Sequence, residues 1–318
     1  MAKRKRNSKA TRYRNRVTLA SAVLAVVVLC VLISVNGSFQ LPFLPTWGSL
    51  YSAFGLHSTP PSEGTLCVTV LDVGNADCIL LQSGDNTALI DAGENTDDDA
   101  VLTALKSAGV TKLDYVIATH ADADHIGSMD TVIRNIPIDT FLMSFMPKGH
   151  TPTTRTYERM LEAMADCNVL PTEAEHGVVY PFGEATITIL SGLSDYTETN
   201  DQSVVCMLSH GEMDFLFMGD AGKEVEREIL DAVPTLDVEV LKVGHHGSSS
   251  SSDGGFIRSV SPDIALITCG YNNSYNHPHS TTLQTLKRNA VTVFRSDLNG
   301  EIVLTSDGTT VTVATEKE

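Results

Sequence analysis

Four potential metal ligands lie within residues 120–125 of this sequence, directly after a short apolar run. Residues 115–118 read Tyr-Val-Ile-Ala, and residues 119–125 read Thr-His-Ala-Asp-Ala-Asp-His. An apolar run that ends in polar residues is typical of a buried strand followed by a loop. Side chains two positions apart can face the same way there, so His120 and Asp122 are expected to share one metal ion. Asp124 and His125 are expected to reach a second ion. Imidazole and carboxylate ligands suit zinc, manganese or iron.

Two further apolar runs end in ligands of the same kind. Residues 215–218 lead into Asp220, and residues 240–243 lead into His245 and His246. Taken alone, Asp220 is an ordinary turn residue. Paired histidines flanked by glycines at a strand end are uncommon in a purely structural role. Three strand ends that offer such ligands together predict a two-metal hydrolytic site.

The chain after residue 64 mixes short strands with helices. Strands are expected near residues 66–73, 78–82, 87–91, 114–119, 185–190, 203–209, 213–218, 238–243, 264–268, 291–294, 301–305 and 310–313, and helices near residues 97–107, 126–134, 153–166, 223–230 and 281–288. This order predicts an α+β domain of two packed sheets flanked by helices, over residues 65–318. The five-serine run at 248–252 is predicted to be a mobile loop.

The N-terminal part of the sequence predicts a membrane anchor. Residues 1–16 contain eight basic side chains and no acidic ones, and residues 17–35 form an uncharged, almost wholly apolar run. Basic residues before such a run favour the cytoplasm. We therefore expect a basic cytoplasmic tail (1–16), a transmembrane helix (17–35), a linker (36–64) and a catalytic domain outside the cell membrane. The alternative is a cleaved signal peptide, which would release a secreted protein.

Beyond residue 16 the chain is strongly acidic. Eight of the 22 Lys and Arg residues precede residue 17, so the remaining 14 face all 39 Asp and Glu residues, a net charge of −25. A body this acidic repels polyanions at long range. The charge therefore counts against tight binding to long duplex DNA. A nucleic-acid substrate would have to be recruited by bound metal or by a local basic patch.

The order of these motifs resembles the metallo-β-lactamase superfamily, and more closely the hydrolase domain of ComEC-type competence proteins. The similar segments lie at residues 71–77, 90–93, 119–127, 200–203, 219–220, 242–248 and 276–278, and together cover about residues 65–315. The resemblance implies a metallo-β-lactamase αββα sandwich with two divalent metal ions at one edge. It also implies a stand-alone hydrolase module, because one candidate spanning segment is too few for a DNA channel.

The resemblance further implies roles for individual residues. Asp220 would bridge the two ions, and Asp91 would orient the metal loop without touching the metal. His277 would bind substrate or transfer a proton, although a residue before Pro278 can also be a simple turn residue. Lys242 or His277 would assist at the oxyanion. The implied metal ligands are His120, Asp122, Asp124, His125, Asp220 and one of His245 and His246, with Asp124 and Asp220 also catalytic.

The sequence departs from the superfamily pattern in two places. Asp122 stands where the wider superfamily has His. A later strand position also lacks its His, and Asn200 and Ser203 lie in that region instead, where they are expected to support the site or the substrate. One metal would therefore have fewer and harder ligands. This loosens the preference for zinc and admits manganese.

The predicted reaction is metal-dependent hydrolysis. Two cations a few ångströms apart lower the pKa of a bridging water, and the resulting hydroxide attacks phosphorus or a carbonyl carbon. The ComEC resemblance favours a phosphodiesterase or nuclease, with a phosphodiester such as DNA as substrate and no obligate protein partner. The alternatives are an esterase or lactonase for small substrates at the cell envelope, such as phosphocholine esters, and a non-catalytic surface binding module.

Overall fold

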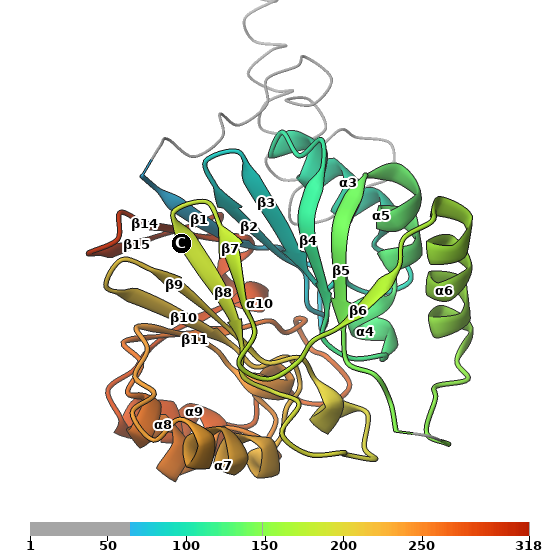
Figure 1. Cartoon of the computed structure of the whole chain (residues 1–318). Helices are drawn as coiled ribbons and strands as arrows, with labels where there is room; N and C mark the ends of the chain where they lie inside the picture. The colour runs from blue at the N-terminus through green and yellow to red at the C-terminus, as the bar shows by residue number, and fades with distance from the viewer. Residues whose placement is uncertain (1–63, 148, 318) are drawn as a thin grey trace, which may run out of the picture. The chain divides into compact units, whose positions relative to one another are not determined.

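Two β-sheets pack face to face in the part of the chain that the structure describes (Figure 1). The computed structural model describes residues 64–147 and 149–317. The first sheet has the strand order β15-β14-β1-β2-β3-β4-β5-β6, and the second has the order β13-β12-β11-β10-β9-β8-β7.

The strands of the first sheet are β1 (Leu66–Val70), β2 (Ile79–Ser83), β3 (Asn86–Ile90), β4 (Leu113–Ala118), β5 (Ile138–Met143), β6 (Pro171–Glu173), β14 (Ile302–Ser306) and β15 (Val311–Thr315). The strands of the second sheet are β7 (Val179–Phe182), β8 (Ala185–Ile189), β9 (Cys206–His210), β10 (Met213–Phe217), β11 (Val240–Lys242), β12 (Ile264–Ile267) and β13 (Thr292–Arg295).

Helices cover the outer face of each sheet (Figure 1). On the first sheet lie α3 (Asp98–Ser107), α4 (Ala123–Ile126), α5 (Met129–Asn135) and α6 (Arg155–Cys167). On the second sheet lie α7 (Lys223–Ala232), α8 (Gly254–Val260) and α9 (Ser280–Arg288). Short helical turns occur at η1 (Asn200–Gln202), η2 (Gly244–Gly247) and α10 (Ser296–Asn299). The αββα sandwich that the sequence predicts is confirmed.

Apolar side chains from both sheets fill the space between them. The largest are Phe182, Phe215 and Phe217, each at most 1% exposed. Full burial of such a side chain stabilises the fold by roughly 1.5–3 kcal/mol. This shared core fixes the position of one sheet on the other, and so fixes which loops meet at the sandwich edge.

Carboxyl ends of strands from both sheets meet at one edge of the sandwich. In the first sheet β3, β4 and β5 are parallel, and β1 runs the same way because it is antiparallel to β2, which is antiparallel to β3. In the second sheet β10, β11 and β12 are parallel. The loops that follow β3, β4, β10, β11 and β12 carry most of the predicted site residues.

Some elements were not predicted from the sequence. β6 and β7 each contain a proline, a residue that argues against a strand except at a sheet edge, and each of them is an edge strand. α8 begins with two glycines, which disfavour helix, but the Asp253 side chain caps it by accepting a hydrogen bond from Gly255 N at 2.7 Å. Strand β5 was also missed.

The prediction of a mobile loop at the five-serine run needs correction, because hydrogen bonds anchor this segment. The hydroxyl of Ser251 donates to the Gly244 carbonyl at 2.6 Å. The backbone N–H groups of Ser252 and Asp253 donate to the buried carboxylate of Glu226 on α7. The run is thus tied both to the loop after β11 and to helix α7.

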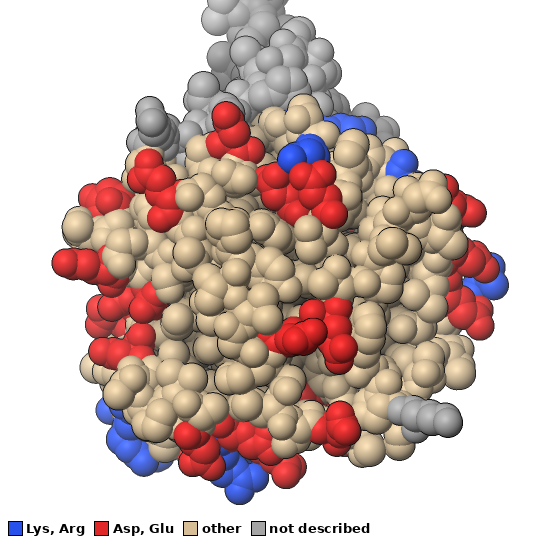
Figure 2. Space-filling model, in the orientation of Figure 1, with Lys and Arg blue, Asp and Glu red and all other residues tan. Residues whose placement is uncertain are grey.

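Most of the charged side chains on the face shown in Figure 2 are acidic, although other residues cover the larger part of it. Asp and Glu occur across this face, whereas Lys and Arg lie towards its margins. The predicted tail, transmembrane helix and all but the last residue of the predicted linker, residues 1–63, lie outside the described residues. Among the described residues, no helix has the length and apolar character needed to cross a membrane.

Candidate metal centre

Asp91 anchors the loop that carries His120 and His125. This residue follows β3, is fully buried, and accepts a hydrogen bond from the Thr119 backbone N–H at 2.8 Å. Its carboxylate also accepts hydrogen bonds from the Thr119 hydroxyl at 2.6 Å and from His125 Nδ1 at 2.7 Å. Because Nδ1 of His125 donates to Asp91, its Nε2 is left to face the site. This arrangement is typical of metal-ligating histidines.

Asp220 and His246 enter the site from the second sheet. Asp220 follows β10, and its backbone N–H donates to Ser203 Oγ at 3.0 Å. His246 follows β11, and its Nδ1 donates to the Thr268 carbonyl at 2.9 Å, so that Nε2 faces the site. The φ angles of His245 and His246 are 51° and 50°, in the left-handed region. Such strain in non-glycine residues is concentrated at functional sites.

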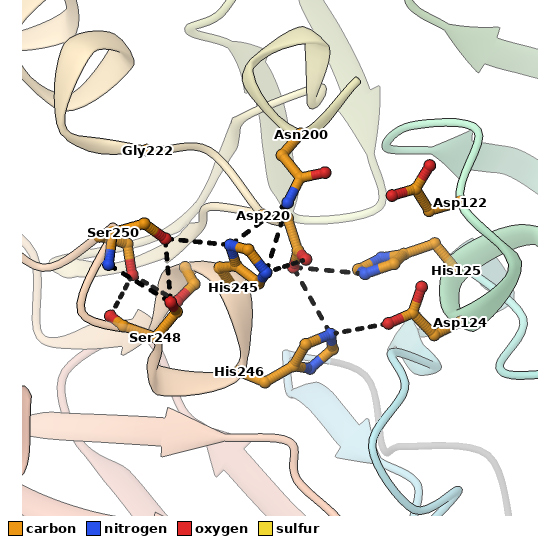
Figure 3. Close-up of polar contacts among 12 residues, drawn as sticks. Asp122, Asp124, His125, Asn200, Asp220, Gly222, His245, His246, Ser248 and Ser250 are labelled. Atoms are coloured by element: carbon orange, nitrogen blue, oxygen red, sulfur yellow. Dashed lines mark hydrogen bonds and ion pairs between the residues drawn. The ribbon is translucent and has the colours of Figure 1, made fainter. Parts of the chain in front are cut away.

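The ligand atoms from the two sheets converge on the Asp220 carboxylate (Figure 3). Asp220 Oδ1 lies 3.3 Å from His125 Nε2 and 3.6 Å from His246 Nε2. Asp124 Oδ2 lies 3.4 Å from His246 Nε2. Two ligand atoms bound to one tetrahedral zinc ion at roughly 2.1 Å are about 3.4 Å apart. The observed spacings therefore match neighbouring ligands in one coordination shell.

Buried polar atoms without a hydrogen-bond partner mark the interior of the site. Within the described residues they include Nε2 of His120, His125 and His246 and Oδ1 of Asp220. Each buried polar atom left unpaired costs about 1–3 kcal/mol. Imidazole nitrogens and a carboxylate oxygen are a donor set that divalent transition metals prefer. These residues therefore fit a metal centre.

Among the described residues, potential ligand atoms form three overlapping groups, each within 4.8 Å. Two of them contain atoms that face the site: one joins His120, His125 and Asp220, and the other joins Asp124, His125 and His246. The third joins His125 to Asp77 and Asp91, whose carboxylates are already paired with Lys242 and with Thr119 and His125. His125 has one free ring nitrogen, so it serves one ion only. The predicted ligand Asp122 lies at the rim, with a side chain 46% exposed and its Oδ2 3.7 Å from His120 Nε2.

The two adjacent histidines differ in position. The side chain of His245 is 28% exposed, and its Nε2 lies 3.7 Å from Asp220 Oδ2. The His245 ring also lies 3.1 Å from the Ser250 hydroxyl. His246 is buried and belongs to one of the two ligand groups. Of the pair, His246 is therefore the better placed to bind metal.

Charges at the site stabilise one another. Burial disfavours protonation of His125, but the carboxylates of Asp220 and Asp91 outweigh it and hold its pKa well above the ordinary value. Burial also disfavours a charged Asp220, yet His246 and His125 hold its pKa well below the ordinary value. Burial, together with nearby His125, lowers the pKa of His120 to about 3. A metal ion would replace the protons of the cationic rings, so metal binding should release protons.

The structure corrects the catalytic role expected of Lys242. Its side chain is fully buried, and its Nζ lies 2.7 Å from Asp77 Oδ2. The Asp77 carboxylate also accepts a hydrogen bond from the Thr268 hydroxyl and lies 3.5 Å from His246 Nδ1. Lys242 thus belongs to a buried network behind His246 and has no access to a substrate.

Asp77 and Thr268 are supporting residues that the sequence did not reveal. Asp77 lies in the motif at residues 71–77, but its partner Lys242 is far away in the chain and in the other sheet. Thr268 follows β12 with no motif of its own. Besides that motif, the one sequence signal for Asp77 was its position directly before the apolar run at residues 78–81.

The other predicted site residues lie around the ligands. Ser203 Oγ lies 3.4 Å from His120 Nδ1, behind the ligand atom of that ring. Asn200 Nδ2 lies 3.2 Å from His245 Nδ1. The buried ring of His277 lies 5.4 Å from that of His245, between ring centroids. Burial and the neighbouring histidines lower the pKa of His277 to about 4.

Comparison with known families identifies the same region. Residues 71–271 match the family profile described as the metallo-beta-lactamase superfamily. ComE operon protein 3 of Bacillus subtilis is 34% identical over 206 residues, which cover 64% of this chain and 26% of that protein. Competence protein ComA of Neisseria gonorrhoeae is 25% identical over 285 residues, or 88% of this chain and 38% of that protein. The chain thus spans about a quarter to two fifths of the length of these relatives.

Among solved structures, the metallo-beta-lactamase fold protein YhfI from Bacillus subtilis aligns with a TM-score of 0.52 and 15% identity. The alignment covers 76% of this chain and 99% of YhfI. At this identity the similarity establishes the fold and carries no information on the substrate.

The Asp77–Lys242 pair yields a prediction about stability. Replacement Lys242→Met should lower the free energy of unfolding by about 3–5 kcal/mol, because it leaves the Asp77 carboxylate buried without its cation. Urea denaturation in a chelating buffer measures this loss independently of bound metal. The double variant Lys242→Met with Asp77→Asn should recover part of it.

The matched control is Lys112→Met. Lys112 forms ion pairs with Asp114 and Asp139 at 2.7 and 2.8 Å, but its side chain is 46% exposed. Loss of such exposed pairs should cost much less stability than loss of the buried pair, because solvent screens them. Equal effects of Lys242→Met and Lys112→Met would contradict a supporting role for the buried pair.

Proposed function

Because the chain belongs to the metallo-β-lactamase superfamily, we propose that this site binds two divalent cations and hydrolyses phosphodiesters. The observation that carries the proposal is the convergence of buried, unpaired ligand atoms from two sheets on Asp220. The relatives with competence names favour a nucleic-acid diester as substrate, as does the replacement of a superfamily His by Asp122.

The ligands would form two cation sites, with His125 used at only one of them. Asp220, His120 and the rim residue Asp122 would hold the first, and Asp124, His125 and His246 would hold the second, with Asp220 adjacent to both. When bound, the cations would lower the pKa of a shared water and stabilise negative charge in the transition state. Either zinc or manganese suits this mixture of imidazole and carboxylate ligands.

Buried contacts within the chain orient the ligands before a cation binds. Asp91 and the Thr268 carbonyl hold the outer ring nitrogens of His125 and His246, so both Nε2 atoms face inward. The Asp77–Lys242 pair supports His246 from behind. Because these contacts are buried, little reorganisation is needed when ligands engage a cation.

A second candidate function is hydrolysis of a small ester, such as a phosphocholine ester or a lactone. A pocket of about 290 Å³ opens beside Asp220 and His245, near the lower end of the size range of small-molecule sites. Glu198 and Asp201 line it, together with Lys223, whose Nζ donates to the Ser249 carbonyl at 2.7 Å. This acidic lining favours a neutral or cationic group over a polyanion. A third candidate, a non-catalytic binding module, would not need the preorganised ligands.

The substrate panel that tests the proposal contains bis(p-nitrophenyl) phosphate, single-stranded DNA and p-nitrophenyl phosphocholine, each with Mn²⁺ or Zn²⁺. We expect hydrolysis of the first two. Asp220→Asn should lower turnover at least about a hundredfold, equivalent to roughly 2.7 kcal/mol of lost transition-state stabilisation.

The control for the Asp220 substitution is Asp231→Asn, an exposed residue of α7, which should keep wild-type turnover. Near-normal turnover by Asp220→Asn would refute the proposed site. Cleavage of the phosphocholine ester without cleavage of DNA would favour the small-ester function.

We also propose that the catalytic domain works outside the cytoplasmic membrane. The support is the sequence pattern of eight basic residues followed by the apolar run at 17–35. Protease added to intact cells should then digest the domain, with a cytoplasmic protein as the protected control. Protection of the domain until the cells are lysed would rule this location out.

A further inference from the structure

Exposed aromatic side chains gather at the metal edge of the sandwich. Among the described residues, the large aromatic side chains on the surface are Phe145 (47% exposed), Tyr271 (76%) and Tyr275 (63%). Phe145 follows β5, and both tyrosines follow β12. These strands end at the edge that carries the metal ligands. Exposed aromatic rings that follow these strands are available to contact a ligand bound at this edge.

Tyr275 extends a row of nearly parallel rings that begins at a metal ligand. The His246 and His277 ring centroids are 6.2 Å apart, with the planes inclined by 25°. The Tyr275 and His277 centroids are 5.6 Å apart, with the planes inclined by 23°. These separations lie within the usual range for stacked rings. Tyr275, which is 63% exposed, therefore lies at the outer end of this row, two rings away from His246.

The loop that carries Tyr275 is held in place although its side chain is exposed. The Asn273 amide Nδ2 donates hydrogen bonds to the Gly270 carbonyl at 2.9 Å and to the His277 carbonyl at 2.6 Å. Its Oδ1 accepts a hydrogen bond from the His277 backbone N–H at 2.9 Å. Asn273 thus links Gly270, before Tyr275 in the loop, to His277, after it. The ring position is set before any ligand arrives, which lowers the entropic cost of binding.

We propose that Tyr275 stacks on an unpaired base next to the scissile phosphodiester and is thereby a specificity-determining residue. This inference rests on the proposed phosphodiesterase function. Bases within a duplex are already stacked and cannot offer a face to Tyr275, whereas each base of a single strand can. The acidic surface also disfavours the dense charge of a duplex more than that of a short single strand. Stacking supplies affinity that does not depend on a basic groove.

The test is equilibrium binding of a fluorescent phosphorothioate octathymidylate to the full-length, metal-loaded protein, followed by anisotropy. Base–aromatic stacking lost on alanine substitution should weaken binding about fivefold to a hundredfold for Tyr275→Ala. Tyr275→Phe keeps the ring and should bind like the wild type. An octamer without bases has the same backbone charge and should bind the wild type and Tyr275→Ala equally weakly.

Two results would overturn the stacking role: equal affinity of the wild type and Tyr275→Ala for the octathymidylate, or undiminished binding of the octamer without bases. The outcome is separable from that of the proposed function. If the protein hydrolyses diesters but Tyr275→Ala binds octathymidylate as tightly as the wild type, the stacking role alone is refuted. If octathymidylate binding depends on Tyr275 but the protein hydrolyses no diester, the phosphodiesterase function is refuted and the binding site is supported.

Discussion

The contact of Asp220 with histidines from both sheets is the interaction on which the site depends. Asp220 belongs to the second sheet, His125 to the first, and their ligand atoms lie 3.3 Å apart. This approach requires the two sheets to be fixed in one relative position. The apolar core between them, with Phe182, Phe215 and Phe217, supplies that position. The geometry of the metal site is therefore a consequence of sheet packing.

Hydrogen bonds behind the ligands orient the histidine rings towards the site. Asp91 and Thr268 each hold one ring nitrogen of a histidine and leave the other unpaired. In a buried site this is costly unless a cation completes the arrangement. Asp77 and Lys242 join the two sheets directly behind the ligands. The same residues that stabilise the edge of the sandwich thus orient its metal ligands.

The sequence predicted those features that are local in the chain. The cluster at residues 120–125, the strand ends before Asp220 and His246, and most helices follow from short patterns of apolar and polar residues. The αββα arrangement followed from motif order and is confirmed. The two ligand groups that face the site could not be predicted from local sequence patterns. Each joins His125 of the first sheet to a residue of the second sheet, Asp220 or His246.

Features that depend on distant pairs could not be predicted. Lys242 was expected near the substrate because it precedes the paired histidines, but pairing with Asp77 places its ammonium in the interior. Strand β7 was hidden by Pro181, which is tolerated because β7 is a sheet edge. The ring row from His246 to Tyr275 depends on how the loop after β12 folds back over the site.

The central claim, that Asp220 is shared between two cation sites, is tested most directly by metal content. Equilibrium dialysis against Zn²⁺ or Mn²⁺, followed by elemental analysis, should find two ions per chain in the wild type. Asp220→Asn should retain fewer than one ion under the same conditions, because the substitution weakens both sites together. No bound metal in the wild type, or two ions retained by Asp220→Asn, would contradict the account.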